Sequence, residues 1–197
     1  MATLDRPSNH REELGIVINS AGSRFAAVAA VLFLGAPIAA YLSGDPRALF
    51  YVHVGLGAFW FGLDFFFKFV LGPALDEVPD DAAGVINQKL VPKMAVVAEP
   101  LSVGVIASGI ALAEMMGYWD SPSIWLWGAL GIGVTMLLIG FGPLHYLTTK
   151  MGVELSRPEP DPERLDELFG ATMKWGLVQT VLMLAIIAMM TGIRWQI

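Results

Sequence analysis

Five long runs of apolar residues, separated by polar stretches, dominate the hydropathy pattern of the chain. Each run is close to the roughly 20 residues that a helix needs to cross the apolar part of a bilayer. Composition agrees with this pattern, because 55% of the 197 residues are hydrophobic and only 15% are charged. The sequence therefore predicts an all-α integral membrane protein with five transmembrane helices. The predicted spans are about residues 24–42, 48–71, 94–116, 124–146 and 173–193.

A polar segment precedes the first run. Residues 1–23 carry charges of both signs and are too polar and too acidic for a cleaved signal sequence. We predict a cytoplasmic tail here, and the alternative is that its second half lies along the membrane surface. Residues 24–197 are then expected to form a single transmembrane helical domain.

Lysine and arginine are unevenly distributed between the two sides of the predicted membrane. The side of the amino terminus, which includes the polar stretches 74–92 and 147–172, holds nine of them, whereas the other side holds only Arg47 and Arg194. Because basic segments stay in the cytoplasm, we expect a cell (inner) membrane protein with its amino terminus inside and its carboxyl terminus outside. The nine residues are Arg6, Arg11, Arg24, Lys89, Lys93, Lys150, Arg157, Arg164 and Lys174.

The second apolar run contains ionisable side chains that are costly to place in lipid. At about 100° per residue, all of them fall on one stripe of the predicted helix. Ionisable groups inside a membrane normally face protein or a water-filled cavity, so we interpret the stripe as the wall of an internal site. The stripe consists of His53, Gly57, Trp60, Asp64, Lys68 and Leu71.

A weak internal repeat relates the last four spans. The second and fourth spans contain Phe69-Val-Leu-Gly-Pro73 and Ile139-Gly-Phe-Gly-Pro143 near their ends, and Gly72-Pro73 is expected to stop the second span. The third and fifth begin with Lys93-Met-Ala-Val-Val and Lys174-Trp-Gly-Leu-Val. We predict a four-helix core of two parallel helix-pair repeats plus one extra amino-terminal helix. Chance similarity between glycine-rich spans is the alternative.

Several polar side chains from different spans fall at a similar depth, toward the cytoplasmic side, at about 1.5 Å of rise per residue. Lys68 is expected to pair with Asp64 at i,i+4 or with Glu99 across helices. Such a layer either only fixes the register of the helices or forms a binding site or proton path. This predicted inner polar layer comprises Asp64, Lys68, Glu99, Gln179 and His145.

The outer half of the predicted bundle carries different chemistry. His53 lies near the outer end of its span, and imidazole and thioether groups are ligands for haem iron or copper. The alternative is an interfacial histidine bonded to a carbonyl or a lipid head group, with methionines that fill apolar space. His145 lies near the opposite face and is not expected to share a metal with His53. The methionines of this half are Met115, Met116, Met189 and Met190.

Two functional classes find no support in the composition. The chain has no cysteine, which excludes disulfides and thiolate sites for metals or redox chemistry. No basic and aromatic residues are arranged for binding nucleic acid.

The pattern His53-x6-Trp60-x-Gly62, followed by the helix end Leu71-Gly-Pro73, resembles the first core helix of the CopD-like membrane superfamily. That superfamily includes copper-resistance D domains and related four-helix membrane proteins, and HemJ-type protoporphyrinogen oxidases are more distantly similar. The similarity covers about residues 48–195. In HemJ-type proteins the corresponding histidine is implicated in binding haem b, which implies the same role for His53. The Tyr-Leu-Pro-Arg-like run of HemJ-type proteins and the methionine and histidine clusters of copper transporters are missing.

The resemblance implies a b-type haem-binding redox or sensor protein, with His53 as an axial ligand. Gly57 and Trp60 are expected to line the porphyrin slot, Met115 and Met116 are candidates for the second ligand, and copper is the alternative metal. Two other classes stay open. One is a metal or solute transporter that uses the inner polar layer, and the other is a non-catalytic subunit of a larger membrane complex. Expected partners are the lipid bilayer and either a second copy of the chain or other membrane subunits.

Overall fold

A computed structural model describes residues 9–195 of the chain. Within this range all regular structure is helical, and five helical stretches are long and apolar enough to cross a membrane. The predicted all-α fold with five spans is therefore confirmed. In chain order the elements are α1 (His10–Ala21), α2 (Ser23–Leu42), α3 (Pro46–Phe66), the π-helical turn η1 (Phe67–Leu71), α4 (Gly72–Asp76), α5 (Asp80–Met115), α6 (Ile124–Ile139), the π-helical turn η2 (Gly140–Leu144), α7 (His145–Leu155) and α8 (Pro162–Trp195).

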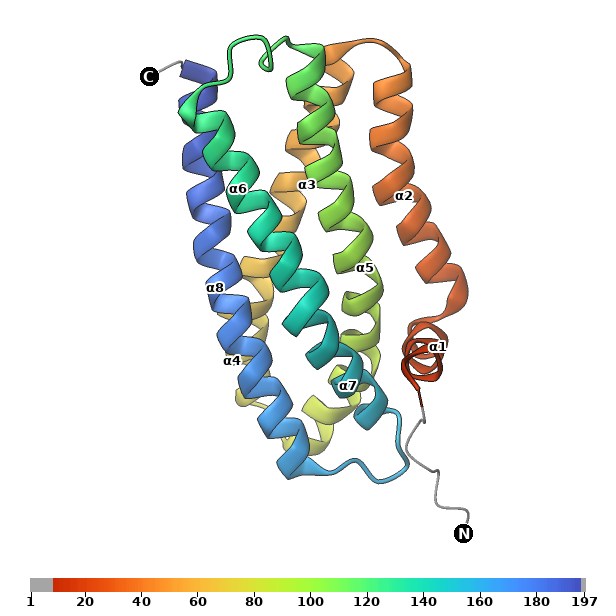
Figure 1. Ribbon diagram of the computed structural model, residues 1–197. Helices are drawn as coiled ribbons and strands as arrows, with labels where there is room; N and C mark the ends of the chain where they lie inside the picture. Colours follow the sequence, from red (N-terminus) through yellow and green to blue (C-terminus); the bar gives the residue numbers. More distant parts are fainter. Residues whose placement is uncertain (1–8, 196–197) are drawn as a thin grey trace.

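Four of the spans form a closed ring. Helix α5 contacts α3 on one side and α6 and α7 on the other, and α8 contacts α6, α7 and α3. Helix α2 lies outside this ring and packs on α3 and α5 (Figure 1). This arrangement is the predicted four-helix core with one extra helix, and the two repeated pairs are α3–α5 and α6–α8. Helix α1 lies at one end of the bundle, which we call the α1 end, and the last turn of α8 lies at the opposite end (Figure 1).

The helices extend further at the α1 end than the hydropathy pattern predicts. Most of the polar stretches 74–92 and 147–172 is helical, and only residues 77–79 and 156–161 separate the helices there. These extensions carry enough apolar side chains to pack against one another at the α1 end, so burial stabilises helix beyond the apolar runs. The residues that pack together are Met151, Leu155, Leu168, Val91, Leu147 and Leu165.

The expectation that Gly72-Pro73 stops the second span is wrong, because the helix continues through it to Asp76. A proline lacks an N–H group and its ring collides with the carbonyl four residues earlier. The wider turn η1 absorbs this, with the N–H of Gly72 bonding to the carbonyl of Phe67, five residues back. The turn η2 contains the equivalent Gly142-Pro143, where the backbone leaves helical geometry (φ −91°, ψ −106° at Gly142). Both repeats thus interrupt their first helix at the same motif.

Helices α2 and α5 approach each other at Gly104. A Cβ atom built on Gly104 would lie 2.1 Å from the backbone carbonyl oxygen of Phe33, so only glycine fits there. Around this contact Ala29, Phe33, Val97 and Leu101 form a buried cluster. Close contact between small residues is a common way of holding helices together in lipid.

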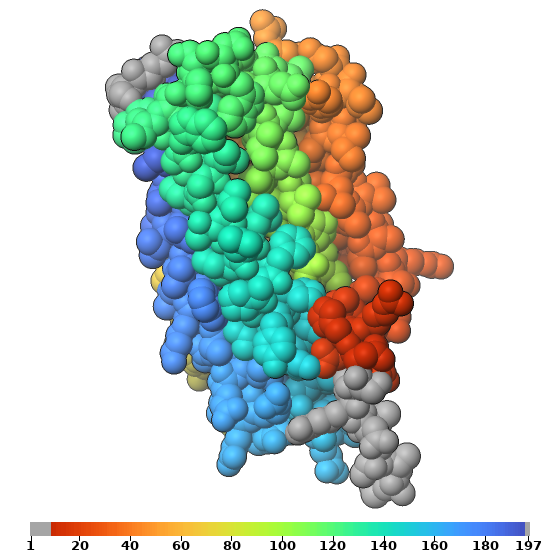
Figure 2. Space-filling view, viewed as in Figure 1, coloured from red at the N-terminus to blue at the C-terminus, as the bar shows by residue number. Residues whose placement is uncertain are grey.

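Helix α1 forms from part of the predicted tail and lies across the ends of the spans, seen nearly end-on in Figure 1. The side chain of Asn9 caps it by accepting from the N–H of Glu12 at 3.0 Å. The helix ends before Gly22, whose φ of 92° turns the chain into α2. Its buried face contacts α7, where Gly152 leaves room for Val17. In Figure 2 it sits against the lower part of the face that α6 and α7 form.

The outer surface of the spans is strongly apolar. Val31, Leu42, Ile124, Leu138 and Val181 are each at least 65% exposed. A surface of this kind is unfavourable in water and suits the hydrocarbon part of a bilayer. The chain is therefore a multi-pass membrane protein.

Candidate functional site

The predicted polar stripe on α3 and η1 faces the interior of the bundle. Its members are half-buried, whereas Phe65, Phe66, Phe69 and Val70 on the other side of the same helix are 46–49% exposed. The interior side of α3 therefore carries the ionisable groups, and the outer side carries phenylalanine. The half-buried members are His53, Gly57, Trp60, Asp64, Lys68 and Leu71.

Three polar side chains meet where α3 and η1 contact α8. Lys68 Nζ forms a hydrogen-bonded ion pair with Asp64 and also donates to Thr180 Oγ1 at 3.0 Å. Thr180 donates to the second carboxylate oxygen of Asp64 at 2.5 Å. The side chains of Asp64 and Lys68 are only 13% and 12% exposed. We call Asp64, Lys68 and Thr180 the α3/α8 cluster.

Helix α8 leaves room for Lys68 at Gly176. A Cβ atom on Gly176 would lie 2.7 Å from Lys68 Cε and 3.3 Å from its Nζ. The lysine therefore reaches α8 only because this position has no side chain. Of the two partners expected for Lys68, the structure pairs it with Asp64 and not with Glu99.

Glu99 instead pairs with His145 on the far side of the ring. A carboxylate oxygen of Glu99 in α5 is hydrogen-bonded to Nδ1 of His145, the first residue of α7. The bend at η2 directly precedes His145 and determines its direction. The side chains of Glu99 and His145 are 37% and 17% exposed. We call this pair the α5/α7 cluster.

The α5/α7 cluster continues into α1. Nε2 of His145 lies 3.1 Å from Nε2 of His10, and the two rings meet at an interplanar angle of 73°. Nδ1 of His10 lies 3.7 Å from a carboxylate oxygen of Glu13. Glu13, with 9% of its side chain exposed, forms an ion pair with Lys150 of α7. A chain of polar contacts thus joins Glu99 of α5, through the less exposed His145, to the exposed His10 of α1.

Gln179 belongs to neither cluster. It is buried between α8 and α6 and donates to the carbonyl of Met136 at 3.4 Å. Its Oε1 is the one buried side-chain oxygen or nitrogen without a partner among residues 9–195. The predicted inner polar layer is therefore divided into two separate clusters and this single amide.

Both clusters lie at interfaces between the two repeats. The α3/α8 cluster joins the first helix of the first repeat to the second helix of the second repeat. The α5/α7 cluster joins the second helix of the first repeat to the continuation of the first helix of the second repeat. The offset of 81 positions that relates Lys93 to Lys174 also relates Glu99 to Thr180. Equivalent positions of the two repeats, Glu99 and Thr180, therefore provide a polar side chain to the two interfaces. Each of them lies beside a π-helical turn.

His53 is held against α5, in the half of the bundle away from α1. Its Nδ1 lies 3.0 Å from the carbonyl oxygen of Val105 and 3.1 Å from Ser108 Oγ. The ring lies against Gly109, where a Cβ atom would be 2.8 Å from the ring carbon Cε1. When Nδ1 donates to the Val105 carbonyl, Nε2 keeps its lone pair. The predicted alternative of a histidine that bonds a carbonyl matches this contact, which is also how a metal-ligating imidazole is oriented.

The two other predicted slot residues have different surroundings. Nothing lies within 4 Å of the position that a Cβ atom would take on Gly57, so the helix surface there is open. Trp60 packs against the buried cluster around Phe33 and Leu101, between α2 and α5.

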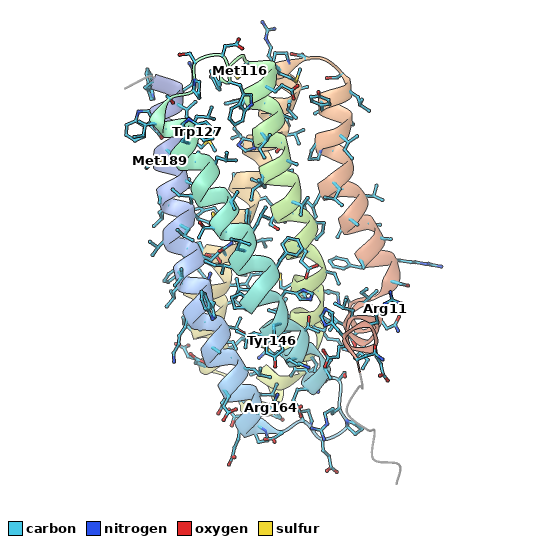
Figure 3. All side chains as sticks on the ribbon, in the orientation of Figure 1. Arg11, Met116, Trp127, Tyr146, Arg164 and Met189 are labelled. Carbon is cyan, nitrogen blue, oxygen red and sulfur yellow. The ribbon has the colours of Figure 1, made fainter. Side chains whose placement is uncertain are left out.

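The four methionines have different environments, and Met116 and Met189 lie in the half of the bundle opposite α1 (Figure 3). Met115 packs beside Leu49 and Leu112, and Met116 is 45% exposed. Met189 Sδ would be 2.8 Å from a Cβ atom on Gly128 of α6, and Met190 is 36% exposed. Their surroundings do not single out one of them as a second ligand.

Four residues of these clusters were not predicted from the sequence: His10, Glu13, Lys150 and Thr180. The first two lie at i,i+3 spacing directly after the helix cap Asn9-x-x-Glu12, which is a signal for an amphipathic helix. Thr180 is found by extending the repeat offset from Glu99. No sequence signal connects Lys150 to Glu13.

Comparison of the chain with protein-family models, with curated proteins and with solved structures finds no match.

Proposed function

We propose that this protein is a secondary transporter for a small charged solute, with the α3/α8 cluster as its central site. The observation that carries the proposal is the shielded Asp64–Lys68 pair, bonded to Thr180 at the interface between the repeats. In transporters built from repeats, binding sites lie at the repeat interface, beside breaks in the helices. The turn η1 is such a break, and it contains Lys68.

The pair can exchange its partners with a solute. A solute carboxylate can replace Asp64 on Lys68, and a solute ammonium group can replace Lys68 on Asp64. Helices α3 and α8 contact each other over a short stretch, whereas α3–α5 and α6–α8 contact each other extensively. Opening this pair therefore loosens one seam of the ring and leaves the helix pairs intact, which is the movement that alternating access requires.

We also propose that the α1 end faces the cytoplasm, as the distribution of lysine and arginine predicts. Arg11 and Arg164 both lie at this end (Figure 3). The solute would then enter or leave the cytoplasm at the α1 end of the seam between η1 and α8. We further propose that the four-helix core is related to the CopD-like superfamily. This relationship does not identify the solute.

Transport can be measured in liposomes that contain the purified protein and a pH-sensitive dye. Pulses of organic acids, amines, amino acids and inorganic ions are added with and without an imposed membrane potential. We expect at least one class to give a flux above that of protein-free vesicles. Asp64→Asn combined with Lys68→Met removes the pair without leaving an unpaired charge and is expected to abolish this flux.

Glu114→Gln is the matched control, because Glu114 is exposed near the opposite end of α5, and it should transport normally. Full flux in the folded double variant would overturn the proposal. So would wild-type vesicles that behave like protein-free vesicles in every arm.

A second candidate function, binding of a b-type haem, is favoured by the bond from His53 Nδ1 to the Val105 carbonyl. This bond fixes the orientation of the ring and leaves Nε2 available as a ligand to haem iron. A bound haem would supply redox chemistry. A second ligand is not identified, because Met115 packs in the cluster of Leu49 and Leu112 and Met189 lies against Gly128 of α6. We therefore propose at most a single protein ligand to the iron.

The absorption spectrum of protein expressed with ample haem tests this candidate. A Soret band that His53→Ala removes and His145→Ala leaves unchanged would support it. Colourless wild-type protein would exclude it and leave the transporter proposal untouched.

A further inference from the structure

The two histidines at the α1 end have their Nε2 atoms directed at each other, 3.1 Å apart. A tetrahedral metal ion with bonds of about 2.0–2.1 Å holds two imidazole nitrogens about 3.3 Å apart. The separation in the protein is within a few tenths of an ångström of that value. The interplanar angle of 73° between the rings also allows both lone pairs to converge on one point. From this geometry we infer that His10 and His145 form a binding site for a divalent transition-metal ion.

Each histidine has a carboxylate near its other nitrogen, but only the Glu99 carboxylate is within hydrogen-bond distance. Glu99 is hydrogen-bonded to Nδ1 of His145, and Glu13 lies 3.7 Å from Nδ1 of His10. Metal-ligating histidines almost always donate their second N–H to a carboxylate, a carbonyl or water. Here His145 has this support from Glu99 of α5. Glu13, which also pairs with Lys150, lies close enough to give the same support to His10 after a small side-chain movement.

The carboxylates also determine what lies between the rings. If Nδ1 of each ring carries the proton that its carboxylate accepts, both Nε2 atoms present lone pairs to each other. In this tautomer two lone pairs face each other at 3.1 Å, and a cation between them stabilises the arrangement; in the other tautomers one Nε2–H donates a hydrogen bond to the opposite ring. A metal ion satisfies both lone pairs at once, and a single shared proton is the competing occupant.

The chemistry of the site selects imidazole-binding ions such as Zn²⁺, Co²⁺, Ni²⁺ or Cu²⁺. Residues 9–195 contain no group of three histidine, cysteine or acidic side chains arranged for a metal. The ion would therefore have two protein ligands and complete its shell with water, which reaches the site because the His10 side chain is 56% exposed. Binding would clamp α1 onto α7. This inference does not depend on the proposed transport function.

The test uses the untagged full-length chain in detergent, first stripped of metal with a chelator. Co²⁺ is titrated and its visible absorption recorded, and Zn²⁺ binding is measured by calorimetry. We expect one ion per chain in the wild type and no saturable binding in His10→Ala or His145→Ala. Glu13→Gln should bind about tenfold more weakly, as for other supporting residues. Glu114→Gln is the matched control, because Glu114 is exposed near the opposite end of α5, and it should leave binding unchanged.

A second measurement reports on the clamp. Arg11 is exposed in α1, and Zn²⁺ should slow tryptic cleavage after it in the wild type and in Glu114→Gln, but not in His145→Ala. Circular dichroism confirms that each variant is folded, and His10 is exposed enough to be replaced without disturbing the bundle. Equal binding by the wild type and by both His10→Ala and His145→Ala would overturn the inference. An absence of binding to the wild type would do the same and assign the gap between the rings to a shared proton.

Discussion

Removal of Lys68 should destabilise the protein strongly. Two unit charges about 4 Å apart attract by about 4 kcal/mol at an effective dielectric constant of 20. The side chains of Asp64 and Lys68 are 13% and 12% exposed, so solvent screens this interaction little. Lys68→Met leaves the carboxylate of Asp64 with only Thr180 as a partner. Breaking one side of a buried pair typically costs about 3–5 kcal/mol, and we expect a loss in this range.

The second substitution decides whether the pair itself is responsible. Asp64→Asn combined with Lys68→Met replaces the whole pair by neutral groups, and such replacements are often close to neutral. We therefore expect the double variant to recover most of the stability. Glu99→Gln combined with Lys68→Met is the control and should recover none, because Glu99 is bonded to His145.

Stability is measured by titrating the protein in mild detergent micelles with a denaturing detergent while following helicity by circular dichroism. The free energies of unfolding of the wild type, the single variants and both double variants then form a double-mutant cycle. If Lys68→Met were as stable as the wild type, Lys68 would have to reach water, and the α3/α8 cluster would not contribute to the free energy of unfolding. If both double variants recovered equally, Asp64 would not be the specific partner.

Two further predictions concern packing and orientation. Gly104→Ala should destabilise by about 1–3 kcal/mol in the same assay, as overpacking does, because its Cβ atom would meet the Phe33 carbonyl at 2.1 Å; Gly131→Ala, where nothing lies within 4 Å, should be tolerated. In intact cells, an impermeant thiol reagent should label Asp120→Cys and leave Asp81→Cys unlabelled, and labelling at position 81 would reverse the proposed orientation.

The number and type of the spans could be predicted because the cost of unpaired backbone in lipid leaves few alternatives to long apolar helices. The residues at which the helices end could not be predicted from the apolar runs. Residues such as Val91 and Leu165 lie in stretches that look polar overall, and they are helical because they pack against Met151 and Leu168. The prediction that Gly72-Pro73 ends the second span failed because a helical turn wider by one residue lets the helix continue through the proline.

The stripe on α3 was predictable from periodicity alone, and so was the i,i+4 pairing of Asp64 with Lys68. Contacts between side chains of different helices could not be predicted from the sequence. Depth arguments put Glu99 and Lys68 near the same level and His145 nearer the cytoplasmic surface. They give no angular position around the ring, so they cannot separate one cluster from two. The contribution of α1 was missed because a short amphipathic helix has few apolar residues and gains its stability from the surface that it covers.

The contacts of α1 also have a consequence for the order in which the protein assembles during synthesis. His10 and Glu13 are separated from their partners His145 and Lys150 by 135 and 137 positions. At about 5–20 residues per second, the ribosome needs roughly 7–27 seconds to make that length of chain. Three spans are made within this interval, and Glu13 lacks its partner Lys150 until it ends.

The contacts of α1 with α5 can form as soon as the third span is in the membrane, but its polar contacts with α7 must wait for the fourth. The acidic face of α1 therefore stays solvated in the interface until α7 is made. A product that ends before His145 would hold α1 only through α2 and α5.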